Sequence, residues 1–252
     1  SPDGGRKILI SGGGRCNILP ARVDESCFVT DSSPITLRKI LRSWPLVEQI
    51  AFFERELGLP LVEEAETGKL FPATQRARDV RDRLLALARA RGARLVMDSS
   101  VTGLAPHEGR WRVERAGGPP LEADAVIVAT GGLSVPKTGS DGGGIAIVER
   151  LGHTIHPTYP ALTAVLAEAS PFAALAGISL PVTITARDGA RAAAATGGFL
   201  FTHHGYSGPA VLDVSHVVTR WAATGDSSRA RLLVRWGSRD EAAWHEALRA
   251  AG

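Results

Sequence analysis

The chain has 252 residues, of which 44% are hydrophobic and 22% charged, and its formal net charge is +3. This composition is that of a folded globular protein and excludes a disordered or fibrous chain. No apolar run approaches the roughly 18 residues that a membrane-spanning helix needs, and the N-terminal region lacks the zones of a secretory signal. We therefore expect a cytoplasmic protein with no membrane partner.

Charge and cysteine usage exclude further classes. Arginines such as Arg76, Arg78 and Arg89 are spread along a predicted helix, which is typical of a solvated face, and no aromatic stacking pattern accompanies them, so nucleic acid is not the expected partner. Cys16 and Cys27 have neither C-x-x-C nor metal-ligand spacing, which predicts reduced thiols and no metal site. The single methionine is Met97, so Ser1 is not a translation start and the sequence is either processed or part of a longer protein.

The first predicted element is a short strand at residues 7–10, and it runs into Ser11, three glycines and Arg15. Gly12-x-Gly14 matches the first half of the G-x-G-x-x-G dinucleotide fingerprint. Asn17 replaces the small third residue, and Pro20 shortens the helix that should follow. Asp31 lies roughly 20 residues on, where the ribose-binding acid is expected, but in a polar turn. The pattern therefore favours a glycine turn, or a loop that contacts a ligand in another way.

Helices dominate the next part of the chain. Ser33 can cap a helix over residues 34–44, and a second helix follows over residues 46–57. Residues 59–63 and 70–72 have the pattern of short strands separated by a turn. The clearest helix covers residues 75–91, with Val80, Leu84 and Leu87 on one face and arginines on the other.

Strand patterns follow at residues 94–97, 101–105 and 111–115, with a hairpin turn at 117–120. The run ADAVIVATGG at residues 123–132 is continuously apolar and ends in Thr130, Gly131 and Gly132, which is typical of a strand buried on both faces of a parallel sheet. Ligands gather at the carboxyl ends of such strands.

A second glycine-rich loop, residues 139–144, precedes a predicted helix at 145–151. Strands are then expected at residues 163–166, 180–187 and 199–202, with a hairpin turn at Asp188-Gly189. A helix from Pro209 to about residue 221, a strand at 229–236 and a last helix at 240–250 complete the chain. The change in composition predicts a domain boundary near residue 160.

Four stretches together resemble one family: GRKILISGGGRCN (5–17), VIVATGGLSVPKTGSDGGG (126–144), LGHTIHPTYPAL (151–162) and FTHHGYSGPAVLDVS (201–215). They are similar, in order and approximate spacing, to the BaiN-like flavoproteins, the aminoacetone oxidase family of FAD-binding enzymes. The resemblance covers nearly the whole chain, and the set is specific although each motif alone is weak.

The resemblance implies an α/β fold: a partial two-dinucleotide-binding, Rossmann-like FAD domain at residues 1–160, with an inserted mainly-β domain at 161–252. It implies FAD as the cofactor, with NAD(P)H as an expected electron donor, and a small-molecule substrate. The residues expected to bind the cofactor by this resemblance are Ser11, Gly12, Gly13, Gly14, Arg15, Cys16, Asn17, Val101, Thr130, Gly131, Gly132, Gly142, Gly143 and Gly144.

The chain also departs from the family's pattern. Family members begin with a strand, a G-x-G-x-x-G loop, a helix and a second strand, and they end with a further glycine-rich segment that closes over the flavin. This sequence contains neither, so both domains are expected to be incomplete. We expect the residue 126–129 strand to lack a neighbour and the chain alone to lack a competent FAD site.

Several polar side chains have two interpretations. Cys16 is either a redox thiol beside the flavin or a small packed residue, and packing is favoured because no resolving cysteine is near. Arg15 and Asn17 either bind phosphate or flavin oxygens or cap a turn. Ser134 and Lys137 are candidates for the substrate side of the flavin.

Histidines offer the remaining candidates for catalysis. His203 and His204 can act as an acid and a base, although loop histidines are more often structural, and the family motif favours His203. With Lys137, His203 completes the expected catalytic pair. Ser207 either caps the following helix or helps to bind an anionic substrate there.

The sequence therefore predicts an FAD-dependent oxidoreductase acting on a small organic substrate, with NAD(P)H or oxygen as electron partner. Two alternatives stay open. One is a flavoprotein that modifies tRNA or another RNA, and the other is an inert chain without bound cofactor.

Overall fold

The computed structural model describes residues 3–30, 32–167, 170–189, 191–224, 230–237, 239 and 241–250. Asp31 and Asp240, which figured in the sequence predictions, lie outside these residues. The chain divides into two compact units, Ser1–His153 and Thr154–Gly252. The division falls a few residues before the predicted boundary near residue 160, and each unit has its own hydrophobic core.

The first unit opens with a helix where a strand was predicted. Residues 7–10 belong to α1 (Arg6–Ile10), which begins after Gly5 and leads into a 3-10 helix, Ser11–Gly14. A strand needs a hydrogen-bonded neighbour, and the described residues offer none here, whereas Ile8 packs into the core beside α4 (Ala77–Ala90). Local hydrogen bonds therefore replace the missing ladder.

The predicted helices of this unit are present. Ser33 accepts a hydrogen bond from the Ile35 amide at the start of α2 (Pro34–Ser43), as its capping role requires. Next come α3 (Leu46–Ala51), which continues as a π-helical turn over Phe52–Glu56, and α4. The core is formed by Cys16, Leu57, Leu59, Ala77 and Val80. Arg81 on α4 is an exception to the predicted pattern, because it is buried and pairs with Asp3 and Asp82.

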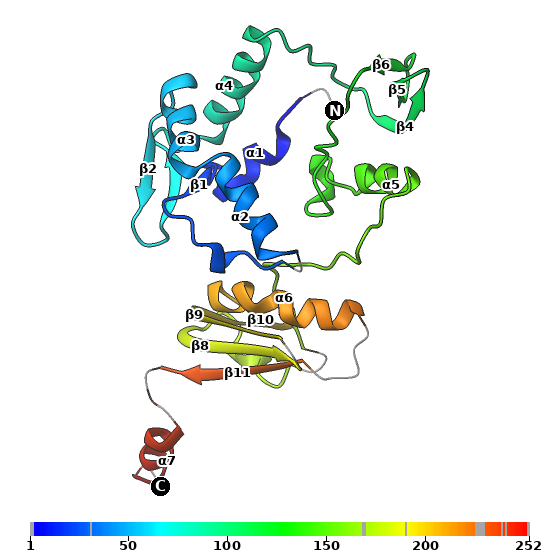
Figure 1. Ribbon diagram of the computed structural model, residues 1–252. Coiled ribbons are helices and arrows are strands. Elements are labelled where there is room, and N and C mark those ends of the chain that lie inside the picture. Colours follow the sequence, from blue (N-terminus) through cyan, green and yellow to red (C-terminus); the bar gives the residue numbers. More distant parts are fainter. Residues whose placement is uncertain are drawn as a thin grey trace. The chain divides into compact units, whose positions relative to one another are not determined.

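Two small antiparallel sheets complete the first unit (Figure 1). One has the order β1-β3-β2, from β1 (Leu19–Pro20), β2 (Leu61–Glu64) and β3 (Lys69–Pro72). The other has the order β4-β5-β6, from β4 (Val101–His107), β5 (Arg110–Arg115) and β6 (Leu121–Ala123), and α5 (Gly143–Arg150) follows.

Besides the strand predicted at residues 7–10, two more predicted strands are not formed. Residues 94–97 and 126–130 have no regular structure, and Ile127, expected to be buried on both faces of a sheet, is 91% exposed. No strand among the described residues is paired with either segment, and all the described ladders are antiparallel. Without a neighbouring strand, an apolar run has neither a hydrogen-bond ladder nor a face to pack against.

The second unit is a five-stranded antiparallel sheet with the order β11-β8-β9-β10-β7. The strands are β7 (Val165–Leu166), β8 (Ser179–Asp188), β9 (Arg191–Thr202), β10 (Gly205–Ser207) and β11 (Arg231–Trp236). The predicted Asp188-Gly189 turn joins β8 to β9, with Gly189 at φ 73°. The helix α7 (Glu241–Ala250) follows β11.

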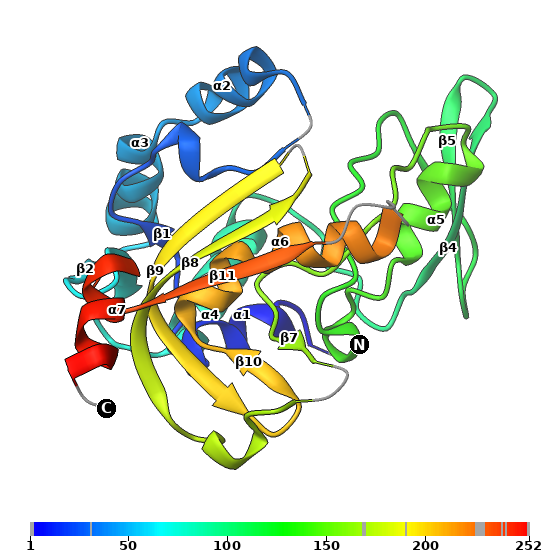
Figure 2. The same ribbon diagram turned by 90° about the horizontal axis from the view of Figure 1, so that it is seen from below.

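One face of this sheet is covered by α6 (Pro209–Thr224), as Figure 1 shows. Alternate side chains of β8, among them Val182, Ile184 and Ala186, pack against Val211 and Val214 of the helix. The period-two alternation of β8 therefore separates a buried face from an open one. In Figure 2, β11, β8 and β9 run side by side in the order that the pairing gives.

Candidate functional site

The SGGGRCN segment forms a tight loop directly after α1. Gly12, Gly13 and Gly14 have φ angles of 56°, 68° and 87°, a left-handed run that glycine adopts without steric penalty. The Cys16 amide donates to the Ser11 carbonyl oxygen at 2.9 Å and closes the loop. The loop is therefore defined by its own backbone.

The three glycines serve different purposes. A Cβ on Gly12 would lie 2.7 Å from the Asn17 nitrogen and 2.9 Å from the Phe71 ring, so Gly12 is needed for close packing. A Cβ on Gly13 would meet nothing within 4 Å, and Gly13 and Gly14 are both exposed. The backbone at Gly13 and Gly14 is therefore the part of the loop that a ligand can approach.

Arg15 contacts three neighbours, and its Nε donates to the Gly12 carbonyl oxygen at 3.4 Å, which is a turn-capping bond. Its Nη1 donates to Glu64 Oε1 at 2.9 Å, and its guanidinium lies over the Phe71 ring, 4.2 Å from the centroid. Hydrogen bonds from Thr67 and from Arg15 lower the pKa of the Glu64 carboxyl. Arg15 therefore caps the glycine loop and also pairs with an ionised Glu64.

Cys16 and Asn17 differ in their surroundings. Cys16 is 6% exposed, in the core with Leu59 and Val80, and burial raises the pKa of its thiol. A raised pKa disfavours the thiolate, so the structure supports packing and not redox chemistry for Cys16. Asn17 is exposed, and its side chain has no hydrogen-bond partner among the described residues.

The segment at residues 130–133 and the glycine-rich loop at residues 139–144 lie against each other. A Cβ on Gly144 would lie 1.9 Å from Thr130 Oγ1, and a Cβ on Gly131 would lie 2.8 Å from Ser140 Oγ. Gly142 has φ 86° and approaches the Leu133 side chain. The start of α5 therefore packs closely on residues 130–133, although these residues form no strand.

A lysine that the sequence reasoning missed links these segments to the first one. The Lys7 Nζ on α1 donates to Ser134 O at 2.6 Å and to Ser134 Oγ at 2.9 Å. Because α1 runs directly into Ser11, this contact ties the SGGGRCN loop to the residue 130–134 segment. The link joins residues 127 positions apart in the chain, so no local pattern could reveal it.

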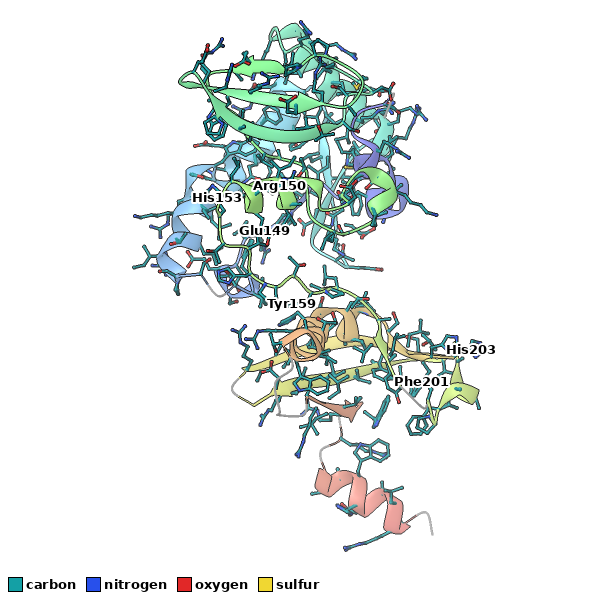
Figure 3. The ribbon with its side chains drawn as sticks, turned by 90° about the vertical axis from the view of Figure 1, so that its right-hand side faces the viewer. Glu149, Arg150, His153, Tyr159, Phe201 and His203 are labelled. Atoms are coloured by element: carbon teal, nitrogen blue, oxygen red, sulfur yellow. The ribbon has the colours of Figure 1, made fainter. Side chains whose placement is uncertain are left out.

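No hydrogen bond between described residues joins Val101 or Lys137 to the SGGGRCN loop, and His203 belongs to the second unit. Val101 starts β4, and Arg150 at the end of α5 donates to the Thr102 carbonyl oxygen at 3.2 Å. Gly143 lies at the other end of this helix. Lys137 is exposed in the first unit and His203 is exposed just beyond β9 in the second (Figure 3). No contact within the described residues assigns either a catalytic role, and both remain predictions.

A shallow pocket of about 270 Å³ borders the first loop. It is lined by Leu9, Gly14, Gln75, Arg76, Ala77 and Arg78, which places the start of α4 beside the glycines. The sequence pattern assigned Arg76 and Arg78 to a solvated face. Only the fold brings them next to Gly14 and adds positive charge to this side of the loop.

Within the ranges that the structure describes, no cluster of three or more histidine, cysteine, aspartate or glutamate side chains could hold a metal ion. Cys16 and Cys27 are free thiols. None of the described helices has the length and apolar character to cross a membrane.

The first unit joins a glycine loop, a second glycine-rich segment and nearby arginines, and comparison with known proteins gives the class of protein. Residues 1–211 match the HI0933-like protein Rossmann domain. The chain therefore belongs to the HI0933-like family, within the FAD-dependent oxidoreductase superfamily. The predicted family and the α/β fold class are confirmed.

Three curated relatives are similar over most of the chain. A 3-dehydro-bile acid delta(4,6)-reductase of Clostridium scindens is 31% identical over 229 residues, covering 90% of this chain and 55% of the relative. A ribosomal RNA dihydrouridine synthase of Haemophilus influenzae is 33% identical over 84% of this chain and 52% of its own length. The Escherichia coli protein of the same name is 28% identical over 84% and 52%. The chain thus spans about half the length of these relatives.

Proposed function

We propose that this chain is part of an FAD-dependent oxidoreductase. The observation that carries the proposal is the family match over residues 1–211, in which the loop at Gly12–Gly14 and the segments at Thr130 and Gly144 are joined within one unit. When bound, the flavin supplies hydride or electron transfer. The residues of the chain bind and orient it.

The loop residues fit a dinucleotide. Gly13 leaves open space beside its backbone, which allows close approach of a phosphate group. Arg78 borders the same pocket and favours an anionic ligand, together with Arg76, which also lies 3.9 Å from the Asp79 carboxylate. Arg15 is preorganised by Glu64 and Phe71 beside this loop. These features support Ser11–Asn17 as a contact segment for FAD.

The chemistry that we propose is reduction of a carbon–carbon double bond, with NAD(P)H as electron donor. The name of the Clostridium relative is that of a reductase of a bile acid, and the other two names describe formation of dihydrouridine, a uridine carrying two added hydrogens. Reduction is the step that these names share. It makes NAD(P)H a better-supported electron partner than oxygen for this site.

An isosteric pair of variants at Gly13 tests the cofactor site. Asn and Asp both tolerate positive φ and have the same size, so Gly13→Asn and Gly13→Asp differ mainly by one negative charge. If FAD phosphates lie beside Gly13, the aspartate raises the FAD dissociation constant about tenfold or more over the asparagine, through like-charge repulsion. The measurement is FAD titration of a protein that contains this chain, followed by the visible absorbance of the flavin.

Equal FAD affinity in the two variants would contradict the placement of FAD phosphates at Gly13. A protein that binds no flavin, with or without the substitutions, would overturn the proposed function itself. Absorbance of the 252-residue chain alone, compared with that of a longer protein containing it, tests the prediction that the chain by itself lacks a competent site.

A second candidate is reduction of uridine in RNA. Two of the three relatives named above are ribosomal RNA dihydrouridine synthases, which favours the RNA-modifying alternative. The two candidates share the flavin site and differ in substrate. Incubation of the reduced protein with unmodified ribosomal RNA, and separately with a steroid enone, distinguishes them by mass spectrometry of the products: an increase of two hydrogens appears in only one of the two substrates.

A further inference from the structure

The open face of the second unit's sheet carries an arginine cluster. Side chains that pair directly across antiparallel strands share a face. The register places Arg231 opposite Arg187, Leu233 opposite Thr185, and Arg235 opposite Thr183. On the other side of β8, the partners of these three β8 residues are Ala192, Ala194 and Thr196 of β9. These nine side chains form three rows on the face away from α6, and we call them the outer face.

All the charged side chains of the outer face are positive. Arg187, Arg231 and Arg235 are exposed, and none of them forms an ion pair with a described residue. The only acidic residue in β8, β9 and β11 is Asp188, which lies on the opposite face and pairs with Arg220 at 3.2 Å. Like charges directly opposite each other, as in the Arg187 and Arg231 pair, destabilise a sheet. An anion on this face would remove that repulsion.

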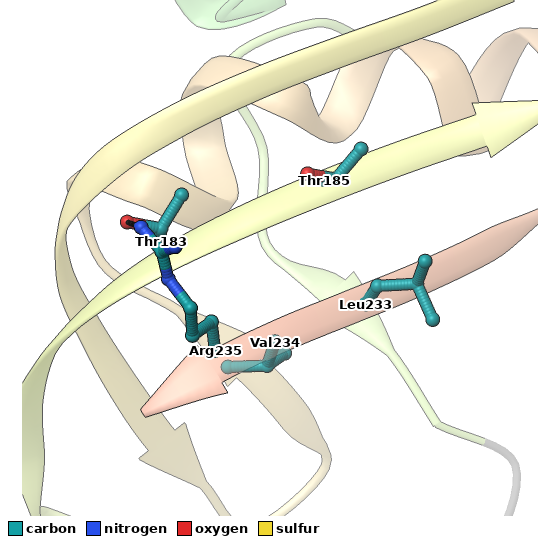
Figure 4. Close-up of a pocket in the computed structure, with 5 residues that line it drawn as sticks. All are labelled: Thr183, Thr185, Leu233, Val234 and Arg235. Atoms are coloured by element: carbon teal, nitrogen blue, oxygen red, sulfur yellow. Dashed lines mark hydrogen bonds between the residues drawn. The ribbon is translucent and has the colours of Figure 1, made fainter. Parts of the chain in front are cut away.

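The surroundings of the arginines suit a polar ligand. Arg235 Nη2 donates to Thr183 Oγ1 at 3.3 Å, and Thr183 and Thr196 share a hydrogen bond at 3.1 Å. A shallow pocket of about 260 Å³ lies along β8 and β11 and is lined by Thr183, Thr185, Leu233, Val234 and Arg235 (Figure 4). On the adjoining strand β9, the small side chains of Ala192 and Ala194 leave the outer face flat. Hydroxyls and guanidinium groups together offer several hydrogen-bond donors.

The spacing of the arginines points to a chain of anions. Arg231 and Arg235 are four residues apart on β11, about 14 Å at 3.4 Å per residue. That span matches several steps of a stacked nucleic-acid strand, which carries one phosphate per roughly 3.4 Å of axis. The outer face offers no aromatic platform, because Trp236 points to the core side. Contacts to phosphate without base reading are therefore what this surface can make.

We propose that the outer face of the second unit binds the phosphodiester backbone of RNA. The inference rests on the second candidate of the proposed function, in which RNA is the substrate of the flavin site. Binding through this face positions an RNA without specifying its sequence. It differs from the sequence-based expectation that nucleic acid is not a partner, because that expectation depended on arginines dispersed along the chain.

The test measures RNA affinity at several salt concentrations. The protein containing this chain is titrated into a fluorescein-labelled single-stranded RNA of mixed sequence, and anisotropy is read between roughly 50 mM and 200 mM KCl. The test variant combines Arg187→Gln, Arg231→Gln and Arg235→Gln. The control combines Arg42→Gln, Arg55→Gln and Arg89→Gln, which removes the same charge from exposed arginines of the first unit that have no ion pair with described residues.

The expected result is a weaker affinity for the test variant and a salt slope reduced by about two, because each lost phosphate contact contributes about 0.7 to the slope for a single strand. The salt slope of the control variant stays within about 0.7 of the parent slope, the contribution of one phosphate contact. Replacing the same three outer-face arginines by lysine keeps most of the affinity, since the charge is retained.

Three outcomes would overturn the inference: a parent protein that does not bind RNA at low salt, a test variant with the parent affinity and slope, or equal losses in the test and control variants. Circular dichroism and thermal unfolding of every variant confirm the fold. The visible flavin absorbance of the same preparations is recorded separately. Lost RNA binding with intact flavin, or the reverse, therefore shows which proposal has failed. Binding to phosphatidylserine vesicles in place of RNA would also count against it.

Discussion

At the scale of single residues, the two cysteines show how the fold assigns different properties to one residue type. Cys16 is in the core of the first unit, whereas Cys27 is exposed. Their spacing in the sequence does not distinguish them. Burial raises the pKa of the Cys16 thiol because the charged thiolate is poorly solvated there.

We predict that native-state alkylation with iodoacetamide labels Cys27 and leaves Cys16 protected. A raised folded-state pKa means that the Cys16 contribution to stability is present below the ordinary thiol pKa and is lost as the pH rises through the folded value. Labelling of Cys16 should therefore increase with pH and with denaturant, read by peptide mass spectrometry. Equal labelling rates for the two thiols at neutral pH would show that Cys16 is accessible and reopen its redox interpretation.

Arg15 illustrates a side chain whose role was open in the sequence. The alternatives were turn capping and ligand binding. Its contacts with Glu64 and Phe71 come from β2 and β3, which are remote in sequence. The structure fixes its orientation beside the glycine loop, and the Gly13 variants decide whether that loop faces FAD.

At the scale of elements, the start of α5 depends on one glycine. Gly144 lies directly against the Thr130 side chain. At the neighbouring Gly143, the atom nearest to an added Cβ would be Asp141 Oδ1, at 3.3 Å. A Cβ on Gly143 therefore requires only a small shift of the Asp141 carboxylate, whereas a Cβ on Gly144 would overlap the threonine hydroxyl.

We predict that Gly144→Ala lowers the free energy of unfolding by about 1–3 kcal/mol, the usual cost of overpacking. Gly143→Ala is the matched control, and it should be neutral or stabilise by up to about 1 kcal/mol through helix propensity. Adding Thr130→Gly to Gly144→Ala should recover part of the loss, because it removes the overlapping atoms. Denaturant unfolding of the four proteins measures these values, and equal effects of the two alanine substitutions would contradict the packing.

The helices and hairpins were the elements that the sequence predicted well. The amphipathic pattern of α4 and the Asp188-Gly189 turn depend on residues close together in the chain. The predictions of strands at residues 94–97 and 126–130 were wrong because strand formation depends on residues far apart in the chain. Their patterns are strand-like, but a strand exists only beside a partner, and none pairs with them in the described part of the chain.

At the scale of the whole molecule, each unit has a separate core. The core of the second unit is formed by β8, β9 and α6, and Ile184 is fully buried in it. The core of the first unit contains Leu59 and Val80. A substitution that removes packing from one core should therefore destabilise the unit that contains it.

We predict that Ile184→Ala destabilises the second unit by about 2–5 kcal/mol, the usual range for such a cavity. Hydrogen exchange followed by mass spectrometry should show lost protection in β8, β9 and α6, with protection of α4 unchanged. Val80→Ala in the first unit is the reciprocal variant and should have the reverse pattern. Equal loss of protection in both units after either substitution would mean that the chain unfolds as one cooperative body.

The sequence by itself determined most of the helices, the hairpin turns and the family, because these depend on local patterns and on motifs in a fixed order. Only the tertiary structure decided that residues 126–130 form no strand, that Lys7 reaches Ser134, and that Arg187, Arg231 and Arg235 share one face. These features depend on which distant segments become neighbours. Strand pairing and side-chain packing set those neighbours, and no local spacing encodes them.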